Sequence, residues 1–229
     1  MTRSDIKQPN DWNVYRLRAA SFAAGHNVGA VSGSGSTSAA AAPLVRFLLH
    51  WLSMHREVRS MVEASSGHWP SGWQSRVVWP RLQYAGVDIV KDQVEANRAL
   101  VAQRGLSAFG LQSAVFLHAN MTHDPLPSAN LLLTKDTLIH MPLRDISHFL
   151  NLSVTSCRDE ALKYALFVHD QLESHHDSNV EIHRHGSHPL DFSKPPFSLD
   201  VTTIFVYPSG RCCKKAVQLL NVSQLCRGA

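Results

Sequence analysis

The most regular hydrophobic pattern of the chain lies between Leu44 and Met61, where apolar residues recur at intervals of three and four. Polar residues such as His50, Arg56 and Glu57 fall on the other side. This spacing predicts an amphipathic helix. Its apolar positions are Leu44, Phe47, Leu48, Trp51, Leu52 and Met54.

Downstream, short apolar runs alternate with segments of helical character. Strands are predicted at 59–64, Leu82–Ile89, Ala114–His118, Asn130–Thr134 and Lys163–His169, then as a terminal antiparallel pair at Val201–Pro208 and Lys215–Val222. Helices are predicted over Val90–Gly105 and after Pro142. We therefore expect an α/β fold, with a Rossmann-like, doubly wound and mostly parallel sheet that ends in an antiparallel strand.

A stretch of small residues, Ala30–Pro43, precedes the first predicted helix. Composition alone indicates a flexible linker there. We expect an N-terminal extension at residues 1–43 and a single domain at residues 44–229.

The overall composition fits a globular protein. Of the 229 residues, 44% are hydrophobic and 17% are charged, which excludes wholesale disorder. No apolar run is long enough to span a membrane, and the first residues lack the apolar core of a secretory signal. A net charge of +4 from scattered Lys and Arg does not by itself indicate nucleic acid binding.

The cysteines show no CxxC spacing. This pattern predicts unpaired thiols in a reducing compartment, and hence a cytoplasmic, intracellular protein. They are Cys157, Cys212, Cys213 and Cys226.

Two neighbouring strand ends carry candidate ligand-binding residues. Asp88 ends a buried strand, where a carboxylate can accept both hydroxyls of a ribose, and Ile89 would offer an apolar wall to an adenine. The alternative is that Asp88 caps the following helix. Glu63 ends the preceding strand, and the small residues Ser65 and Gly67 permit close approach of a nucleotide, or form an ordinary surface turn.

The next two strand ends also carry polar groups. Asn120, beside Met121, could bond an adenine edge or form an Asx-turn. Lys135 and Asp136 follow a strongly buried strand, which favours a site, although Asp136 could also be a helix cap and His140 a packing residue.

A group of histidines lies in the long polar stretch before Ser198. Their spacing matches no known zinc motif and no cysteine lies among them, so we predict no metal site. A polar loop over the ligand crevice is the favoured interpretation. These histidines are His175, His176, His183, His185 and His188.

Taken in order, three segments resemble the class I S-adenosylmethionine-dependent methyltransferases: EASSGHW, YAGVDIVKDQVEANR and FLHANMTHDPLPSANLLLTKDTLIHMP. Within that family they are similar to a group with LDVGCGDW, YxGVDIVxxLVExN, D-xxx-DPLP and CRDVLIHL motifs. The same group has an SGxGST segment near its N-terminus and a PLDLxxPPFxL segment before a final strand pair. Here these read SGSGST (Ser32–Thr37) and HPLDFSKPPFSL (His188–Leu199).

The resemblance implies the class I methyltransferase fold, S-adenosylmethionine as the cofactor and methyl transfer to an acceptor. It does not identify the acceptor, which could be a small molecule, a protein or RNA. It implies that Glu63 contacts the methionine amine and that Ser65 and Gly67 lie beside the methionyl and ribose parts. It likewise implies that Asp88 binds the ribose and that Ile89 packs on the adenine.

The resemblance also assigns residues at the next two strand ends. Asn120, next to Met121, stands where an aspartate usually holds the adenine amine. Lys135 and Asp136 match an Arg-Asp pair that faces the transferable methyl, and His140 matches the histidine of CRDVLIHL. Asp136 is the candidate substrate-orienting group or general base, with Lys135 and His140 as further candidates.

Two features qualify this expectation. The segment SGSGST, with Gly35 and Ser36, becomes a cofactor lid instead of a linker. The glycine loop reads SSGH where the pattern has GCGD, so Ser65 adds a side chain and His68 replaces an acid. These departures favour a second hypothesis, a catalytically silent methyltransferase-like module that binds a protein partner.

Overall fold

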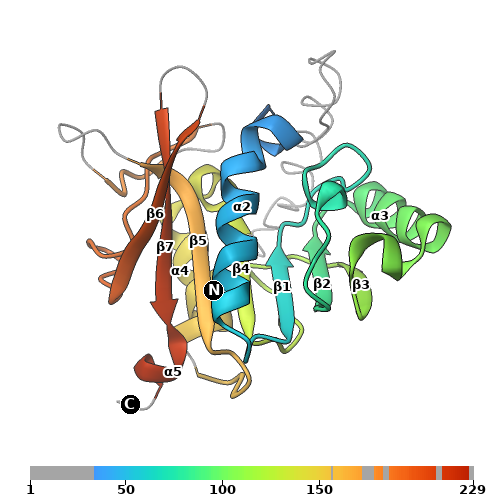
Figure 1. Cartoon of the computed structure of the whole chain (residues 1–229). Coiled ribbons are helices and arrows are strands. Elements are labelled where there is room, and N and C mark those ends of the chain that lie inside the picture. The colour runs from blue at the N-terminus through green and yellow to red at the C-terminus, as the bar shows by residue number, and fades with distance from the viewer. Residues whose placement is uncertain (1–33, 156, 172–177, 183–185, 210–212, 227–229) are drawn as a thin grey trace, which may run out of the picture.

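The computed structural model describes residues 34–155, 157–171, 178–182, 186–209 and 213–226 (Figure 1). A seven-stranded sheet with the order β3-β2-β1-β4-β5-β7-β6 forms its centre. The first five of these strands are parallel, and β7 runs antiparallel to both β5 and β6. The strands are β1 (Ser60–Ala64), β2 (Gln83–Asp88), β3 (Ser113–His118), β4 (Leu131–Lys135), β5 (Tyr164–Gln171), β6 (Val201–Ser209) and β7 (Cys213–Asn221).

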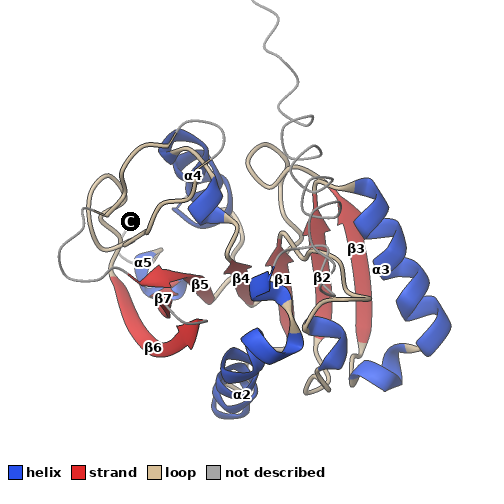
Figure 2. Cartoon of the chain, turned by 90° about the horizontal axis from the view of Figure 1, so that it is seen from above, coloured by secondary structure: helices blue, strands red, loops and turns tan. Residues whose placement is uncertain are grey.

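Helices cover both faces of this sheet. Figure 2 shows α2 and α4 on opposite sides of it. One hydrophobic cluster joins α2 and α3 to the sheet, and a second joins α4 to its other face. The helices are α2 (Ser38–Met54), α3 (Lys91–Arg104), α4 (Leu143–Leu150) and α5 (Val222–Leu225).

Neighbouring residues of the central strands point to opposite faces. Met61 of β1 pairs in register with Tyr84 of β2 and with Leu131 of β4. All three residues belong to the hydrophobic cluster on the α2 side of the sheet. Val62 pairs with Ala85 and Leu132, and these three belong to the α4 side. Because both faces are buried, the strands are nearly continuous apolar runs, which is the pattern that predicted them. The expected α/β fold is confirmed.

Helix α2 begins earlier and ends earlier than its hydrophobic pattern suggested. The Thr37 side chain accepts a hydrogen bond of 3.3 Å from the backbone N–H of Ala40 and caps the helix. Four alanines follow, and alanine is the strongest helix former. The linker expected up to Pro43 is therefore helical from Ser38 onward, and the predicted division after residue 43 falls inside α2. At the other end Met54 is 70% exposed, so its assignment to the apolar face was wrong.

Cys157 and Cys226 form a disulfide between residues 69 positions apart in sequence. The prediction of unpaired thiols is wrong for these two cysteines. Their spacing carries no information about pairing, because the contact arises only when the segment after α4 meets the C-terminal α5. The cysteines therefore give no support to a reducing compartment. Among the described residues, no helix combines the length and apolar character needed to cross a membrane.

Candidate functional site

A hollow lies at the carboxyl ends of the parallel strands, where the strand order reverses between β1 and β4. It contains about 360 Å³ of empty space, including its opening to solvent. In doubly wound sheets this reversal point is where ligands bind. The lining residues follow four different strands: Ser65, Val87, Asp88, Ile89, Ala119, Asn120, Met121, Thr137 and Met141.

Asp88 is the charged residue of this lining. It is 5% exposed, and its Oδ2 accepts a hydrogen bond of 2.8 Å from the N–H of Gly67, while Oδ1 accepts one of 2.9 Å from the N–H of Val90. Burial raises the pKa of this carboxyl, and the backbone N–H groups oppose that rise. The N-cap residue of α3 is Val90, so Asp88 is not the helix cap of the alternative interpretation.

The turn after β1 holds this carboxylate in place. Ser65 and Ser66 donate their backbone N–H groups to the carbonyl of Val87, at 2.8 and 2.9 Å. Ser65 has φ of 67° and Gly67 has φ of 63°. Positive φ is unfavourable for a serine, so the chain keeps the turn of a glycine loop without its first glycine. The backbone of the turn is thus compatible with a glycine-loop function despite the SSGH sequence.

Glu63 does not line the hollow. Its Oε2 accepts a 2.5 Å hydrogen bond from the hydroxyl of Tyr84, and its Oε1 accepts one of 2.8 Å from Gln74. The residue is 1% exposed, and burial raises its pKa to about 7, although Tyr84 and Gln74 act in the opposite direction. Gln74 and Tyr84 were not among the predicted residues. Tyr84 is the first residue of the YAGVDIV motif, so the motif itself could have indicated it.

The raised pKa of Glu63 predicts a pH dependence of stability. The folded protein binds the Glu63 proton more tightly than the unfolded chain, whose carboxyl has the ordinary pKa of 4.5. The stabilisation that this proton gives is complete below the unfolded pKa of 4.5, and it is lost as the pH rises through the folded pKa of about 7. Between pH 5 and pH 8 we expect this group to lower the free energy of unfolding by about 2 to 3 kcal/mol.

Urea unfolding at several pH values measures this effect. Glu63→Gln removes the titrating group and is expected to flatten the profile by that amount. Glu95→Gln, on the exposed side of α3, serves as the control and keeps the wild-type slope. Equal slopes in wild type and Glu63→Gln would show that the pH dependence arises elsewhere.

Asn120 and Met121 follow β3 and reach the hollow together. The Asn120 Oδ1 accepts a hydrogen bond of 3.0 Å from the N–H of Thr122, which is the Asx-turn of the alternative interpretation. Its Nδ2 lies 3.1 Å from the His123 ring. Ile89 and Met121 belong to the apolar part of the lining, together with Val87, Ala119 and Met141.

Lys135 and Asp136 belong to a separate buried charge cluster at the ends of β4 and β5. The Asp136 carboxylate lies 2.5 Å from Lys135 Nζ and 2.7 Å from Lys215 Nζ, and Lys215 also lies 2.6 Å from Asp170. Burial raises the pKa of Asp136, but the two ammonium groups outweigh it, and the net pKa is lowered. Asp136 is therefore held as an anion. Lys215 could not be recognised as a partner from local sequence, because β7 lies about 80 residues further along the chain.

The segment Ser34–Ser36 contacts this cluster. Lys135 Nζ donates a hydrogen bond of 2.9 Å to the carbonyl of Gly35, and the N–H of Trp73 donates one of 3.1 Å to the carbonyl of Ser36. A Cβ at Gly35 would lie 3.0 Å from Asp136 Oδ2, so only glycine fits without displacement. Gly35 and Ser36 thus lie beside Lys135 and Asp136, not among the residues lining the hollow at Asp88.

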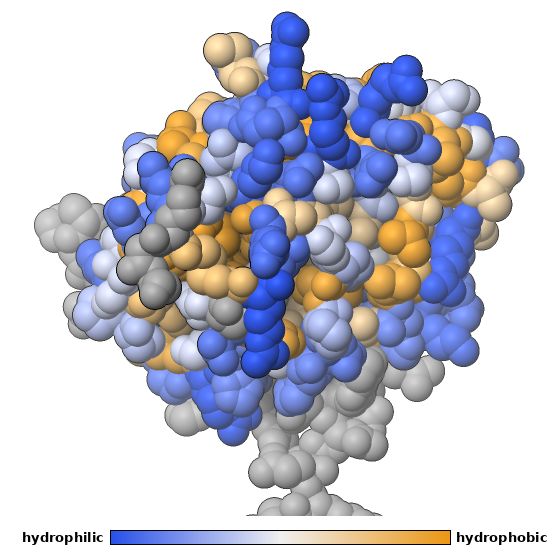
Figure 3. All heavy atoms as spheres, turned by 90° about the horizontal axis from the view of Figure 1, so that it is seen from below, coloured by the Kyte–Doolittle hydropathy of each residue, from blue (hydrophilic) through white to orange (hydrophobic). Residues whose placement is uncertain are grey.

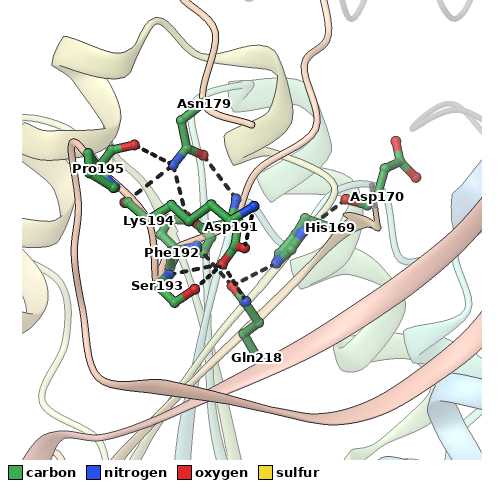
Figure 4. Close-up of polar contacts among 9 residues, drawn as sticks. All are labelled: His169, Asp170, Asn179, Asp191, Phe192, Ser193, Lys194, Pro195 and Gln218. Carbon is green, nitrogen blue, oxygen red and sulfur yellow. Dashed lines mark hydrogen bonds and ion pairs between the residues drawn. The ribbon is translucent and has the colours of Figure 1, made fainter. Parts of the chain in front are cut away.

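The segment that matches PLDLxxPPFxL is fixed to the sheet by a polar network (Figure 4). Asn179 Nδ2 donates to the carbonyls of Asp191, Lys194 and Pro195, and Gln218 Nε2 donates to Asp191 Oδ1. His169 Nε2 lies 3.0 Å from Gln218 Oε1. This loop therefore has a fixed conformation that depends on strands β5 and β7.

Two of the predicted histidines contact the same region. His140 Nδ1 lies 3.3 Å from the carbonyl of Gly186, and the backbone N–H of the buried His188 donates to the carbonyl of Ile139. In the described part of the chain, no three His, Cys, Asp or Glu side chains are grouped to hold a metal ion. The other predicted histidines, His175, His176, His183 and His185, lie outside the described residues.

Neither a protein-family model nor a curated protein sequence matches the chain. Its structure is similar to solved structures of low sequence identity. Magnesium protoporphyrin IX methyltransferase from Synechocystis PCC 6803 with bound SAM gives a TM-score of 0.55 at 11% identity, over 94% of this chain and 99% of that one.

Two further structures agree with this similarity. The methyltransferase domain of bacterial CtHen1-CN gives a TM-score of 0.53 at 10% identity, over 77% of this chain and 97% of that one. The PH0226 protein from Pyrococcus horikoshii OT3 gives 0.52 at 12% identity, over 83% and 96%. With the strand order and the hollow at its reversal point, the chain has the fold of the class I S-adenosylmethionine-dependent methyltransferases.

Proposed function

We propose that the protein is an S-adenosylmethionine-dependent methyltransferase and that the adenosine of its cofactor occupies the hollow beside Asp88. The observation that carries this proposal is the Asp88 carboxylate, which is anchored by the N–H groups of Gly67 and Val90 and lines an otherwise largely apolar hollow. A carboxylate oxygen has capacity for more than one hydrogen bond. Asp88 can therefore hold the ribose hydroxyls without giving up its anchors.

The remaining lining fits an adenine and its neighbouring groups. Ile89 and Met121 come from two different strand ends and offer apolar surface on which a flat ring can pack. The turn at Ser65 and Gly67 lets backbone approach the ligand closely. Asn120 stays in the proposal as the residue beside the adenine edge, although its side chain also forms the Asx-turn.

The cofactor would supply an electrophilic methyl group, and the protein's own residues would position the acceptor and exclude water. Alignment and water exclusion account for much of the rate enhancement in a displacement of this kind. Asp136 is held as an anion by Lys135 and Lys215, so we assign it to orienting a hydrogen-bond donor of the acceptor, with Lys135 as its positioning residue. His140 remains a candidate at the edge of the same region.

Calorimetric titration with S-adenosylhomocysteine tests the proposal. We expect wild-type protein to bind it and Asp88→Ala to bind at least about 30-fold more weakly, because hydrogen bonds to a charged group contribute about 1.5–3 kcal/mol each. Asp92→Ala is the matched control, since Asp92 is exposed in the first turn of α3. Thermal unfolding of each variant shows whether the fold is kept.

The other outcomes are equally informative. No heat from the wild-type protein at millimolar ligand would overturn the proposal and leave the silent, protein-binding module. Equal affinity in wild type and Asp88→Ala would show that the ligand binds away from the hollow.

A further inference from the structure

A second hollow lies at the opposite, amino end of the parallel strands. It contains about 870 Å³ of empty space, including its opening. Val62 of β1 and Leu132 of β4 are neighbours in the strand register and form its floor. The walls combine polar and apolar groups. The apolar ones are Pro125, Leu126, Pro127, Leu152 and Leu162, and the polar ones are Ser128, Ser153, Arg158 and Asp159. Concave surfaces lined by apolar side chains and a few polar groups are typical of small-molecule binding sites.

The connection from β3 to β4, which runs beside this hollow, contains no helix. The chain passes from β3 to β4 through residues 119–130, which contain turns only. Parallel strands are usually joined by a crossover helix that covers the sheet. Here the loop Pro125–Ser128 lies over the floor in place of a helix, and the space beneath it is not filled.

The hollow has one acidic and one basic side chain, and in the described part of the molecule only the acidic one is held by hydrogen bonds. Both carboxylate oxygens of Asp159 accept hydrogen bonds: Oδ1 from Ser128 at 2.7 Å and from the N–H of Ala161 at 3.0 Å, and Oδ2 from the N–H of Ala129 at 3.1 Å. Arg158 is exposed and forms no ion pair with any residue that the structure describes. The Ser153 Oγ is buried and has no hydrogen-bond partner in the described part of the molecule.

We propose that this hollow binds a small amphipathic carboxylate, with its apolar chain on the Val62–Leu132 floor and its carboxylate at Arg158. Apolar and polar surface alternate on the amino face of the molecule, which Figure 3 shows from below. A planar guanidinium pairs with a carboxylate through two parallel hydrogen bonds. Because Arg158 is exposed, its pair with the ligand carboxylate stays near water, while the alkyl chain of the ligand is removed from water. Binding therefore requires both the carboxylate and the alkyl chain.

Titrations with octanoate, its neutral isostere octanamide and acetate separate these two parts. We expect octanoate to bind, acetate to show no binding at millimolar concentration, and hexanoate to bind more weakly than octanoate by about fourfold per methylene. Arg158→Gln is expected to weaken octanoate about tenfold and to leave octanamide unchanged. Leu126→Trp fills the hollow and is expected to weaken both compounds.

Arg144→Gln is the matched control, because the Arg144 side chain is 70% exposed on α4, away from this hollow. Equal octanoate affinity in wild type and Arg158→Gln would overturn the proposal, as would no octanoate binding at all. Competition with S-adenosylhomocysteine gives an independent check. Displacement of octanoate by that compound would place it in the Asp88 hollow and also overturn the proposal, whereas simultaneous binding supports two sites.

Discussion

Trp69→Ala is expected to lower the free energy of unfolding by about 4 kcal/mol, within the range of about 3–5 kcal/mol for truncating a fully buried tryptophan. Trp69 has no exposed surface, and its ring meets Tyr84, Phe109 and Phe116 edge-on. Its indole N–H also donates a 3.3 Å hydrogen bond to the Tyr84 hydroxyl. The substitution removes all of these contacts and leaves a cavity that rigid neighbouring rings fill poorly.

Urea unfolding followed by circular dichroism measures this loss. Trp69→Phe keeps an aromatic ring and is expected to cost clearly less. Val78→Ala, at a side chain that is 69% exposed, serves as the control and should stay within about 0.5 kcal/mol of wild type. A loss below about 1 kcal/mol for Trp69→Ala would mean that the aromatic cluster does not hold this part of the core.

Lys215→Met is expected to destabilise the protein by about 3 kcal/mol, because removing one member of a buried ion pair leaves the other charge uncompensated. Lys215 is 6% exposed and is placed between Asp136 and Asp170. Asp136 keeps Lys135 as a partner, and Asp170 is partly exposed, so we place the loss at the lower end of the range for buried pairs.

The neighbouring Lys214 provides a matched control, since it lies on the same strand with its side chain exposed. Lys214→Met should leave the unfolding free energy nearly unchanged. Adding Asp170→Asn to Lys215→Met removes the carboxylate that has lost its ammonium partner and should recover part of the loss. If Lys215→Met unfolds like wild type, the cluster contributes no net stability.

The strands were predictable because their physical cause is local. A strand buried on both faces must be apolar at successive positions, and Leu131–Leu133 shows this directly in the sequence. The position of Asp88 at a strand end followed from the same pattern. The start of α2 was harder to recognise, because small residues such as those of Ser38–Ala42 are common to linkers and to helices.

The contacts between distant segments were not predictable from local patterns. Asp136 forms one of its two ion pairs with Lys215, and Cys157 forms its disulfide with Cys226. Each pair forms only after β5, β7 and α5 are in place. Glu63 shows the same limit at a strand that was recognised: its position at the end of β1 was correct, but the direction of its side chain depends on Tyr84 and Gln74.

The hydrogen bond between Gly35 and Lys135 ties the segment before α2 to the end of β4. A shortened chain that begins at Ser38 would lose both this contact and the Thr37 cap, and the Lys135 ammonium would be left facing an uncovered carboxylate. Shortened or fused forms of the protein should therefore retain the residues from Ser34 onward, because those residues complete the packing at the end of β4.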